Sequence, residues 1–262
     1  VEMTRCASAL SALTIAATDC LRSASQHTVR SYDEELKFLT HKIAEMGGHA
    51  ERMVEQSVAA IVNADNALAQ RVISDDLILD ASEREIDDKA VMIIAKRQPM
   101  AVDLREIIGS IRISADLERV GDLGKNIAKR VAAVSESRQP VKLYRGLETL
   151  AELALTQLKD VLDAYASRSV QQINVVRDRD DEIDAMYTSL FRELLTYMME
   201  DPRNISACTH LLFCAKNIER IGDHATNIAE TVYYIVTGLQ MPAERPKEDL
   251  SHGIVVDEAR KP

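Results

Sequence analysis

The sequence has few aromatic residues, few glycines and few prolines, and it contains no tryptophan. Aromatic residues make up 4% of the 262 positions, and there are 9 Gly and 6 Pro. A β-sheet protein needs β-branched or aromatic strand formers and turn residues, so this composition argues against an all-β fold. Proline inside a helix costs about 3 kcal/mol, so long proline-free tracts rich in Ala, Leu, Ile, Glu, Lys and Arg favour long helices.

Positive charge and long apolar runs are also lacking. The formal net charge is −10, which argues against general nucleic-acid binding, because phosphate contacts require a basic surface. No run of about 18 apolar residues is present, so we expect no membrane span. The 4 cysteines form no C-x-x-C, which is typical of a reducing compartment. Cys208 and Cys214 fall in an apolar stretch and are expected to be small buried hydrophobes.

Prolines divide the chain into tracts that predict six long helices. Before residue 242, proline occurs at Pro99, Pro140 and Pro202. Gly47-Gly48 and Asp75-Asp76 are points where a helix could be interrupted. The expected helices are Asp33–Val62, Ala67–Arg97, Val102–Val134, Leu143–Tyr165, Val170–Met199 and Ile205–Val236.

The remaining segments predict how the chain is divided. Residues 1–26 are rich in Ala, Ser and Thr and are interpreted as a leader that is disordered or not native. Residues 241–262 contain further prolines and many charges, which is typical of a solvated tail. The polar stretch Ser135–Pro140 is the expected linker. The sequence thus predicts a first unit at 27–137 and a second at 138–240.

An internal repeat supports this division. Residues 116–128 (DLERVGDLGKNIA) align without a gap on residues 217–229 (NIERIGDHATNIA), at an offset of 101. Apolar residues follow both copies in steps of four and three, from Ile113 to Val134 and from Cys214 to Ile235. Such a stripe lies on one helix face and packs against neighbouring helices. We therefore expect an all-α fold, a tandem duplication of an antiparallel three-helix bundle.

Acidic residues four apart recur at equivalent places in both halves. The pairs are Glu83/Asp87, Glu118/Asp122, Asp180/Asp184 and Glu219/Asp223. On a helical wheel, Glu118 and Asp122 lie roughly opposite the apolar stripe. Two acids at this spacing repel each other by a few tenths of a kcal/mol, and a cation that bridges two pairs would relieve the repulsion.

Three interpretations of these pairs remain open. The first is a metal site, because carboxylate oxygens suit hard divalent cations as well as iron and manganese. The second is an ordinary solvated helix face, neutralised locally by Arg119 and Arg220. The third is a metalloenzyme or metal store, but no histidine has a Glu three residues before it, which argues against a di-iron bundle oxidase. Gly121 and Gly222 indicate a close helix approach or room for a bound group. His224 has no counterpart in the first copy, which favours an interhelix or surface role.

Three features of the sequence resemble the PhoU family of bacterial phosphate-signalling regulators. They are the doubled ERVGD/ERIGD motif, the segment Gln98–Arg105 (QPMAVDLR), and the opening His27-Thr28 with Tyr32–Leu36 (YDEEL). The resemblance covers roughly His27 to Gly238. It implies two three-helix bundles related by a pseudo-twofold axis, with no catalytic activity. It also implies a cytoplasmic protein that works at the inner membrane face through its partners.

Further properties are implied by the same resemblance. Members mediate between the ATPase subunit of the phosphate ABC transporter and the phosphate sensor histidine kinase, and they help to repress phosphate uptake and the starvation response. Some members bind iron or zinc through E(D)-x-x-x-D motifs. Carried over to this chain, those motifs are the four acidic pairs, so Glu83, Asp87, Glu118, Asp122, Asp180, Asp184, Glu219 and Asp223 are the expected ligands of iron, zinc or another divalent metal. Separately from the resemblance, the exposed acidic faces and the apolar stripes predict a homodimer.

Overall fold

The protein is built from long helices, as the sequence predicts. The computed structural model describes the backbone of residues 2–135 and 141–242, and the side chains of residues 31–135 and 142–242. The described part contains no β-strand, so the all-α prediction is confirmed. Its six long helices are α1 (Glu2–Asn63), α2 (Asn66–Arg97), α3 (Ala101–Ala128), α5 (Val141–Ser167), α6 (Val170–Glu200) and α7 (Ile205–Thr237). Two short elements, α4 (Val131–Ser135) and a 3₁₀ turn (Pro202–Asn204), complete the order.

Local residue choice explains the helix ends. Asp65 caps α2, where its side chain accepts a hydrogen bond from the Leu68 amide at 2.9 Å. Pro202 follows α6 and begins the 3₁₀ turn. Gly238 ends α7 in the left-handed conformation, with φ of 76°, which glycine adopts without steric cost.

The structure differs from the predicted boundaries at the start of α1, which begins at Glu2 rather than Asp33, and within the third predicted helix. The helix expected over Val102–Val134 is divided into α3 and α4. At the division, the Arg130 amide donates to the Ile127 carbonyl in a tighter i to i−3 bond. No glycine or proline marks the point, so the sequence pattern gives no sign of it. Val131 and Val134 stay buried, which preserves the apolar stripe.

Neither of the suspected interruptions occurs. Helix α1 continues through Gly47-Gly48, and α2 continues through Asp75-Asp76. The predicted leader covers residues 1–26, of which 2–26 form the first part of α1; their side chains lie outside the described residues, and the assignment as a leader stays a prediction. Most of the predicted linker and nearly all of the predicted tail also lie outside the described residues.

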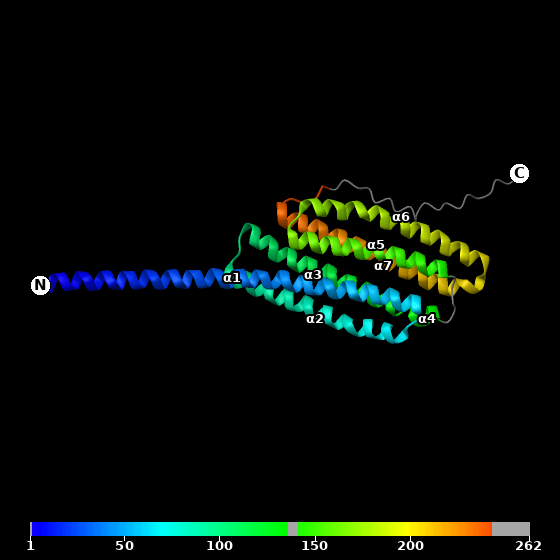
Figure 1. The fold of residues 1–262 in the computed structure, drawn as a ribbon, viewed down its shortest axis with the longest axis horizontal. Helices are drawn as coiled ribbons and strands as arrows, with labels where there is room; N and C mark the ends of the chain where they lie inside the picture. Colours follow the sequence, from blue (N-terminus) through cyan, green and yellow to red (C-terminus); the bar gives the residue numbers. More distant parts are fainter. Residues whose placement is uncertain (1, 136–140, 243–262) are drawn as a thin grey trace.

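The six helices form two bundles. Helices α1, α2 and α3 pack together, as do α5, α6 and α7. The bundles meet through equivalent helices, because α3 packs on α7 and α1 packs on α5 (Figure 1). Contacts between Asp116 and His224 and between Arg130 and His210 place α3 and α7 antiparallel. Such pairing of equivalent helices in opposite directions fits the expected pseudo-twofold relation.

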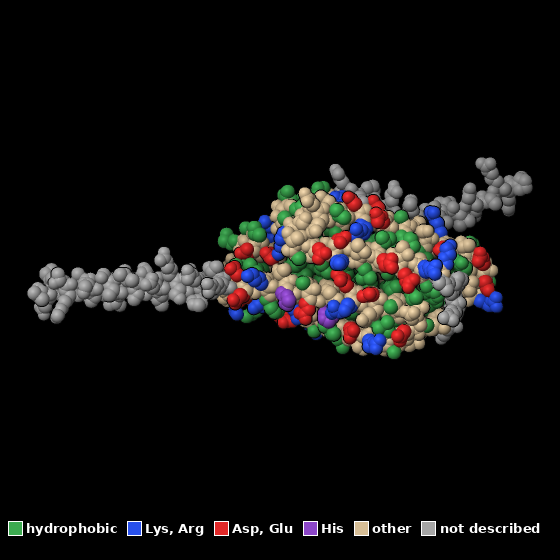
Figure 2. All heavy atoms as spheres, in the orientation of Figure 1, with side chains coloured by type: hydrophobic (Ala, Val, Ile, Leu, Met, Phe, Trp, Pro, Cys, Tyr) green, Lys and Arg blue, Asp and Glu red, His purple; other side chains and the backbone are tan. Residues whose placement is uncertain are grey.

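Aliphatic side chains fill one continuous core. Ile113, Leu117 and Val120 of the first stripe and Ile218 and Ile221 of the second are fully buried. Cys208 and Cys214 are buried as well, which confirms their role as small hydrophobes. The outer face shown in Figure 2 carries acidic and basic side chains interspersed. No helix in the described part of the chain is long and apolar enough to cross a membrane.

Candidate functional site

In the first half, two motif pairs meet on neighbouring helices. Glu83 and Asp87 lie on α2, and Glu118 and Asp122 lie on α3. Their charges influence one another across the helix contact: Glu83 is among the carboxylates that raise the pKa of Glu118. We call these four residues the α2/α3 acidic cluster.

The second half repeats the arrangement. Asp180 and Asp184 lie on α6, and Glu219 and Asp223 lie on α7. Asp184 and Asp223 both raise the pKa of Glu219, although burial is the largest cause of that shift. We call these four residues the α6/α7 acidic cluster. The structure therefore brings together the pairs of each half, and it places the two clusters on different bundles.

The clusters are less exposed than the helical wheel suggests. The side chain of Glu118 is 17% exposed and that of Glu219 is 12% exposed. Helix α2 packs on α3 and carries Glu83, one of the charges that act on Glu118, so Glu118 is half-buried rather than fully solvated. Burial raises the pKa of Glu118, and the nearby Asp122 raises it further, while Arg119 opposes both. A carboxylate in this setting is costly to keep ionised without a cation.

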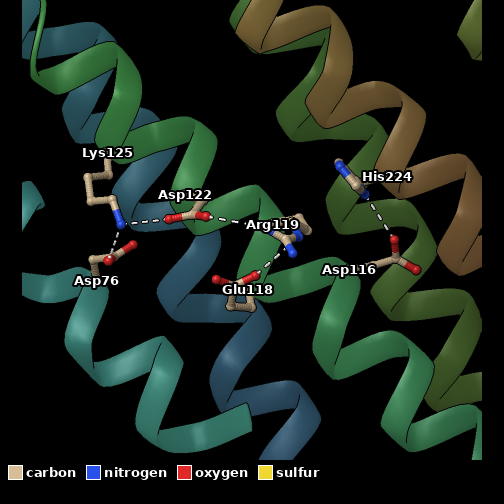
Figure 3. Close-up of polar contacts among 7 residues, drawn as sticks. All are labelled: Asp76, Asp116, Glu118, Arg119, Asp122, Lys125 and His224. Carbon is tan, nitrogen blue, oxygen red and sulfur yellow. Dashed lines mark hydrogen bonds and ion pairs between the residues drawn. The ribbon is translucent and has the colours of Figure 1, made fainter.

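A lysine lies at the edge of the α2/α3 acidic cluster. Lys125 donates hydrogen bonds to Asp122 at 2.6 Å and to Asp76 at 2.5 Å (Figure 3). Asp76 comes from α2 and is 6% exposed. Burial lowers the pKa of Lys125, but its hydrogen bonds with Asp122 and Asp76 outweigh burial and hold the pKa above its usual range. Arg119 lies on the other side, 3.6 Å from both Glu118 and Asp122.

The α6/α7 acidic cluster has different neighbours. At the offset of 101, Thr226 stands where the first half has Lys125. The Thr226 hydroxyl donates to Asp180 at 3.2 Å and accepts from the Gln157 amide at 3.2 Å. On this side, Lys216 lies 2.8 Å from Glu219. The two clusters therefore have carboxylates at equivalent positions, but the lysine of each cluster pairs with a carboxylate at a different position.

Each cluster contains one buried carboxylate oxygen that lacks a hydrogen bond. Among the described residues, Asp87 Oδ1 and Glu219 Oε2 are both buried without a hydrogen-bond partner. Such an oxygen suits a bound cation, because an unsatisfied buried acceptor is otherwise costly. Within the described part of the chain, however, no three His, Cys, Asp or Glu side chains are arranged to hold a metal ion. The donor chemistry fits a hard cation, and the assignment of the eight ligands stays a prediction.

The motif glycines allow close packing. A Cβ on Gly121 would lie 2.2 Å from Leu79 Cδ1, so α2 occupies the space of the missing side chain. At Gly222 the corresponding neighbours are Gln157 Oε1 and Ile183 Cδ1, both at 3.1 Å. The first of the two alternatives for these glycines, a close helix approach, is therefore confirmed.

His224 connects the two bundles. Its Nδ1 lies 2.9 Å from Asp116 Oδ1 across the α3/α7 contact (Figure 3). The interhelix role expected for this histidine is confirmed.

Several polar residues around the clusters were not predicted. Lys125 could have been found, because it follows Asp122 by three residues on one helix face. Asp76 and Gln157 give no such signal, since only helix packing brings them to the clusters.

Comparison with known proteins places the chain in a family. A model of the PhoU domain matches residues 43–131 and 147–232, one match in each bundle. The phosphate-specific transport system accessory protein PhoU homolog of Rhizobium meliloti (strain 1021) is 72% identical over 225 residues, which cover 86% of this chain and 95% of that protein. The protein of the same name in Caulobacter vibrioides (strain NA1000 / CB15N) is 51% identical and also covers 86% of this chain, with 98% of its own length matched.

Two solved structures of PhoU proteins also match this chain. The crystal structure of PhoU from Pseudomonas aeruginosa has a TM-score of 0.74 and 37% identity, and the match covers 79% of this chain and 100% of that chain. The phosphate transport system regulatory protein PhoU from Streptococcus pneumoniae also has a TM-score of 0.74, with 25% identity over 80% of this chain and 99% of that chain. Two helical bundles, each with the repeated acidic motif, and matches of this extent establish that the chain belongs to the PhoU family.

Proposed function

We propose that this protein is a cytoplasmic regulator of phosphate transport that represses phosphate uptake and the phosphate-starvation response. The observation that carries the proposal is family membership over both bundles, together with relatives named phosphate-specific transport system accessory proteins. In this role the protein catalyses no reaction. It acts as an adaptor between the ATPase subunit of the phosphate ABC transporter and the phosphate sensor histidine kinase, and these partners hold it at the inner membrane.

The adaptor mechanism requires only differential binding. Long helices offer extended faces to two partners at once, and the state of the transporter would determine which contacts form. A difference of a few kcal/mol in affinity between two transporter states is enough to shift the population of the kinase complex.

We further propose that the two acidic clusters bind iron, zinc or another divalent metal. The unpartnered oxygens of Asp87 and Glu219 support this, as do the raised pKa values of the cluster glutamates. A bound cation would neutralise carboxylates that repel one another and would hold α2 against α3 and α6 against α7. Its contribution is structural charge compensation.

A combined variant tests the metal proposal in both clusters at once. The variant has Ala in place of Glu118, Asp122, Glu219 and Asp223. Its metal content is measured by elemental analysis after metal-replete purification. The matched control replaces Glu148 and Glu152, an acidic pair four apart on α5 outside both clusters. Metal retained at the wild-type stoichiometry would exclude the ligand assignment.

The adaptor role has its own readout. Purified protein is used to capture the transporter ATPase and the sensor kinase, and repression of a phosphate-responsive reporter is measured in cells. Capture of neither partner, with repression unaffected by deletion of the protein, would refute the adaptor role. Metal binding that persists without partner capture would favour the second candidate, a metal-storing bundle, which the orphaned carboxylate oxygens also suit. Metal-dependent oxygen consumption would indicate a metalloenzyme.

A further inference from the structure

A polar pocket that includes none of the residues of the two acidic clusters lies where the two bundles meet. It has a volume of about 450 Å³ and is lined by Asn126, Lys129, Arg130, His210 and Asn217. The first three come from the end of α3 and the turn that follows it, and the last two from the first half of α7. Its walls therefore carry two basic side chains, a histidine and two amides, and none of the lining residues that the structure describes is a carboxylate.

The basic residues of this pocket have no acidic partner among the described residues. Within the described residues, neither Lys129 nor Arg130 makes an ion pair with a carboxylate, and Arg130 Nε is buried without a hydrogen-bond partner. This is unusual in a chain with a net charge of −10, where most cations can find an acid nearby. Unpaired donors gathered around a cavity provide a setting for an anion.

The guanidinium of Arg130 is held in place by uncharged neighbours. It stacks over the Phe213 ring, with Cζ 4.3 Å from the centroid, and its NH1 lies 3.2 Å from His210 Nδ1. Arginine can only donate, so His210 Nδ1 accepts, and the proton of the neutral ring is then on Nε2. The contact thus orients a second N–H donor, on His210, beside the arginine fork.

The equivalent place at the other end of the α3/α7 interface has the opposite character. At the offset of 101, Lys129 corresponds to Glu230, Arg130 to Thr231 and Asn217 to Asp116. His210 corresponds to Gly109, where Ile235 occupies the space of a side chain, with Cδ1 2.3 Å from a built Cβ. At these matched positions, one end of the interface therefore carries acids and a filled side-chain space, whereas the other carries the residues of the basic pocket. The pocket residues are thus not a general result of the repeat.

We propose that this pocket binds the phosphate group of a small ligand, either free phosphate or the phosphate of a nucleotide. Phosphate oxygens can only accept hydrogen bonds. When both amides turn their NH₂ groups toward the cavity, every side chain of the described lining offers a donor. The planar fork of Arg130 matches two oxygens of one phosphate. The volume is within the range of small-molecule sites, about 300–1,000 Å³, so a phosphate with an attached group fits as well as a free ion. The inference goes beyond the adaptor role, because it assigns to the protein a ligand of its own.

Isothermal titration calorimetry of the full chain tests the proposal. The protein is first treated with a chelator, so that metal in the acidic clusters cannot bind the anion. Inorganic phosphate and ADP are titrated separately. Saturable binding of phosphate supports a free-ion ligand, and binding of ADP without phosphate supports a nucleotide.

Three variants locate the site. Arg130→Gln is expected to weaken binding by about tenfold or more, the factor that corresponds to loss of one charged hydrogen bond. Lys129→Gln changes an exposed lysine, so it tests the pocket even if Arg130→Gln fails to fold. Arg112→Gln is the matched control, because Arg112 also stacks on an aromatic ring, Tyr234 at 5.8 Å, but does not line the pocket. Failure of both probes to bind, or binding that Lys129→Gln leaves unchanged, would overturn the proposal.

Discussion

The ion pair between Lys125 and Asp76 offers a direct test of how the first bundle is stabilised. Replacing Lys125 with Thr gives the residue found at the equivalent position of the second half, Thr226. The partner Asp76 corresponds to Ile173 at the offset of 97 that relates α2 to α6. The chain therefore supplies its own apolar replacement for the pair, since Ile173 is fully buried.

The expected loss follows from the burial of the two side chains. The Asp76 side chain is 9% exposed and that of Lys125 is 20% exposed. Removing one partner of a buried pair costs about 3–5 kcal/mol, because the other charge stays buried without compensation. Water reaches Lys125 in part, so we expect Lys125→Thr to lower the free energy of unfolding by about 3 kcal/mol. The double variant Asp76→Ile/Lys125→Thr removes both charges and is expected to lose less than about 1.5 kcal/mol.

Urea denaturation followed by circular dichroism measures these values. With a slope of about 3 kcal/mol/M for a chain of this size, Lys125→Thr should shift the midpoint by about 1 M. Lys42→Thr is the control, because Lys42 also bridges two acids, Glu45 and Glu85, which are 48% and 51% exposed. Its loss should stay below about 1 kcal/mol. A double variant that is as unstable as Lys125→Thr, or more so, would refute the account of a buried and compensated charge.

Three further predictions concern other parts of the fold. Gly121→Ala should lower the free energy of unfolding by about 1–2 kcal/mol, because its Cβ would overlap Leu79; a urea midpoint higher than that of the wild type would contradict the close approach. The hydrogen bond from Tyr32 to Asp103 accompanies a Tyr32 pKa that burial and Asp103 raise from 10.0 to about 12. Its stabilising contribution is complete below pH 10 and is lost as the pH rises to about 12, so Tyr32→Phe should reduce the fall in stability over that window. Burial raises the pKa of Cys214 to about 12, and with the other three cysteines replaced this thiol should react with a thiol reagent only at the rate of unfolding.

Much of the fold follows from the sequence, because the residues that set helix ends and buried faces act locally. Proline positions bracket the helices, and the apolar stripe identifies the buried face of α3 and α7. The exceptions are positions where another helix decides the outcome. Gly47 does not interrupt α1, since its missing side chain leaves room for Leu162 of α5, whose Cδ1 lies 2.5 Å from a built Cβ. Asp76 does not interrupt α2, because Lys125 pairs with it.

The site was predictable only in part for the same reason. Spacing identifies the acidic pairs, but it cannot reveal that α2 covers Glu118 or that Lys125 reaches across to Asp76. The basic pocket is less predictable still. Lys129 and His210 are 81 residues apart in sequence and meet only through the antiparallel contact of α3 with α7.

Because the two bundles are joined in one chain, the interface between them does not have to be symmetric. A twofold homodimer must present each interface residue twice, so a lysine at one end of the contact implies a lysine at the other. Here Lys129 stands at one end of the α3/α7 contact, and the matching position at the other end is Glu230. The duplicated chain can therefore direct different chemistry to its two ends, and a partner can distinguish one end from the other while both bundles keep the same fold.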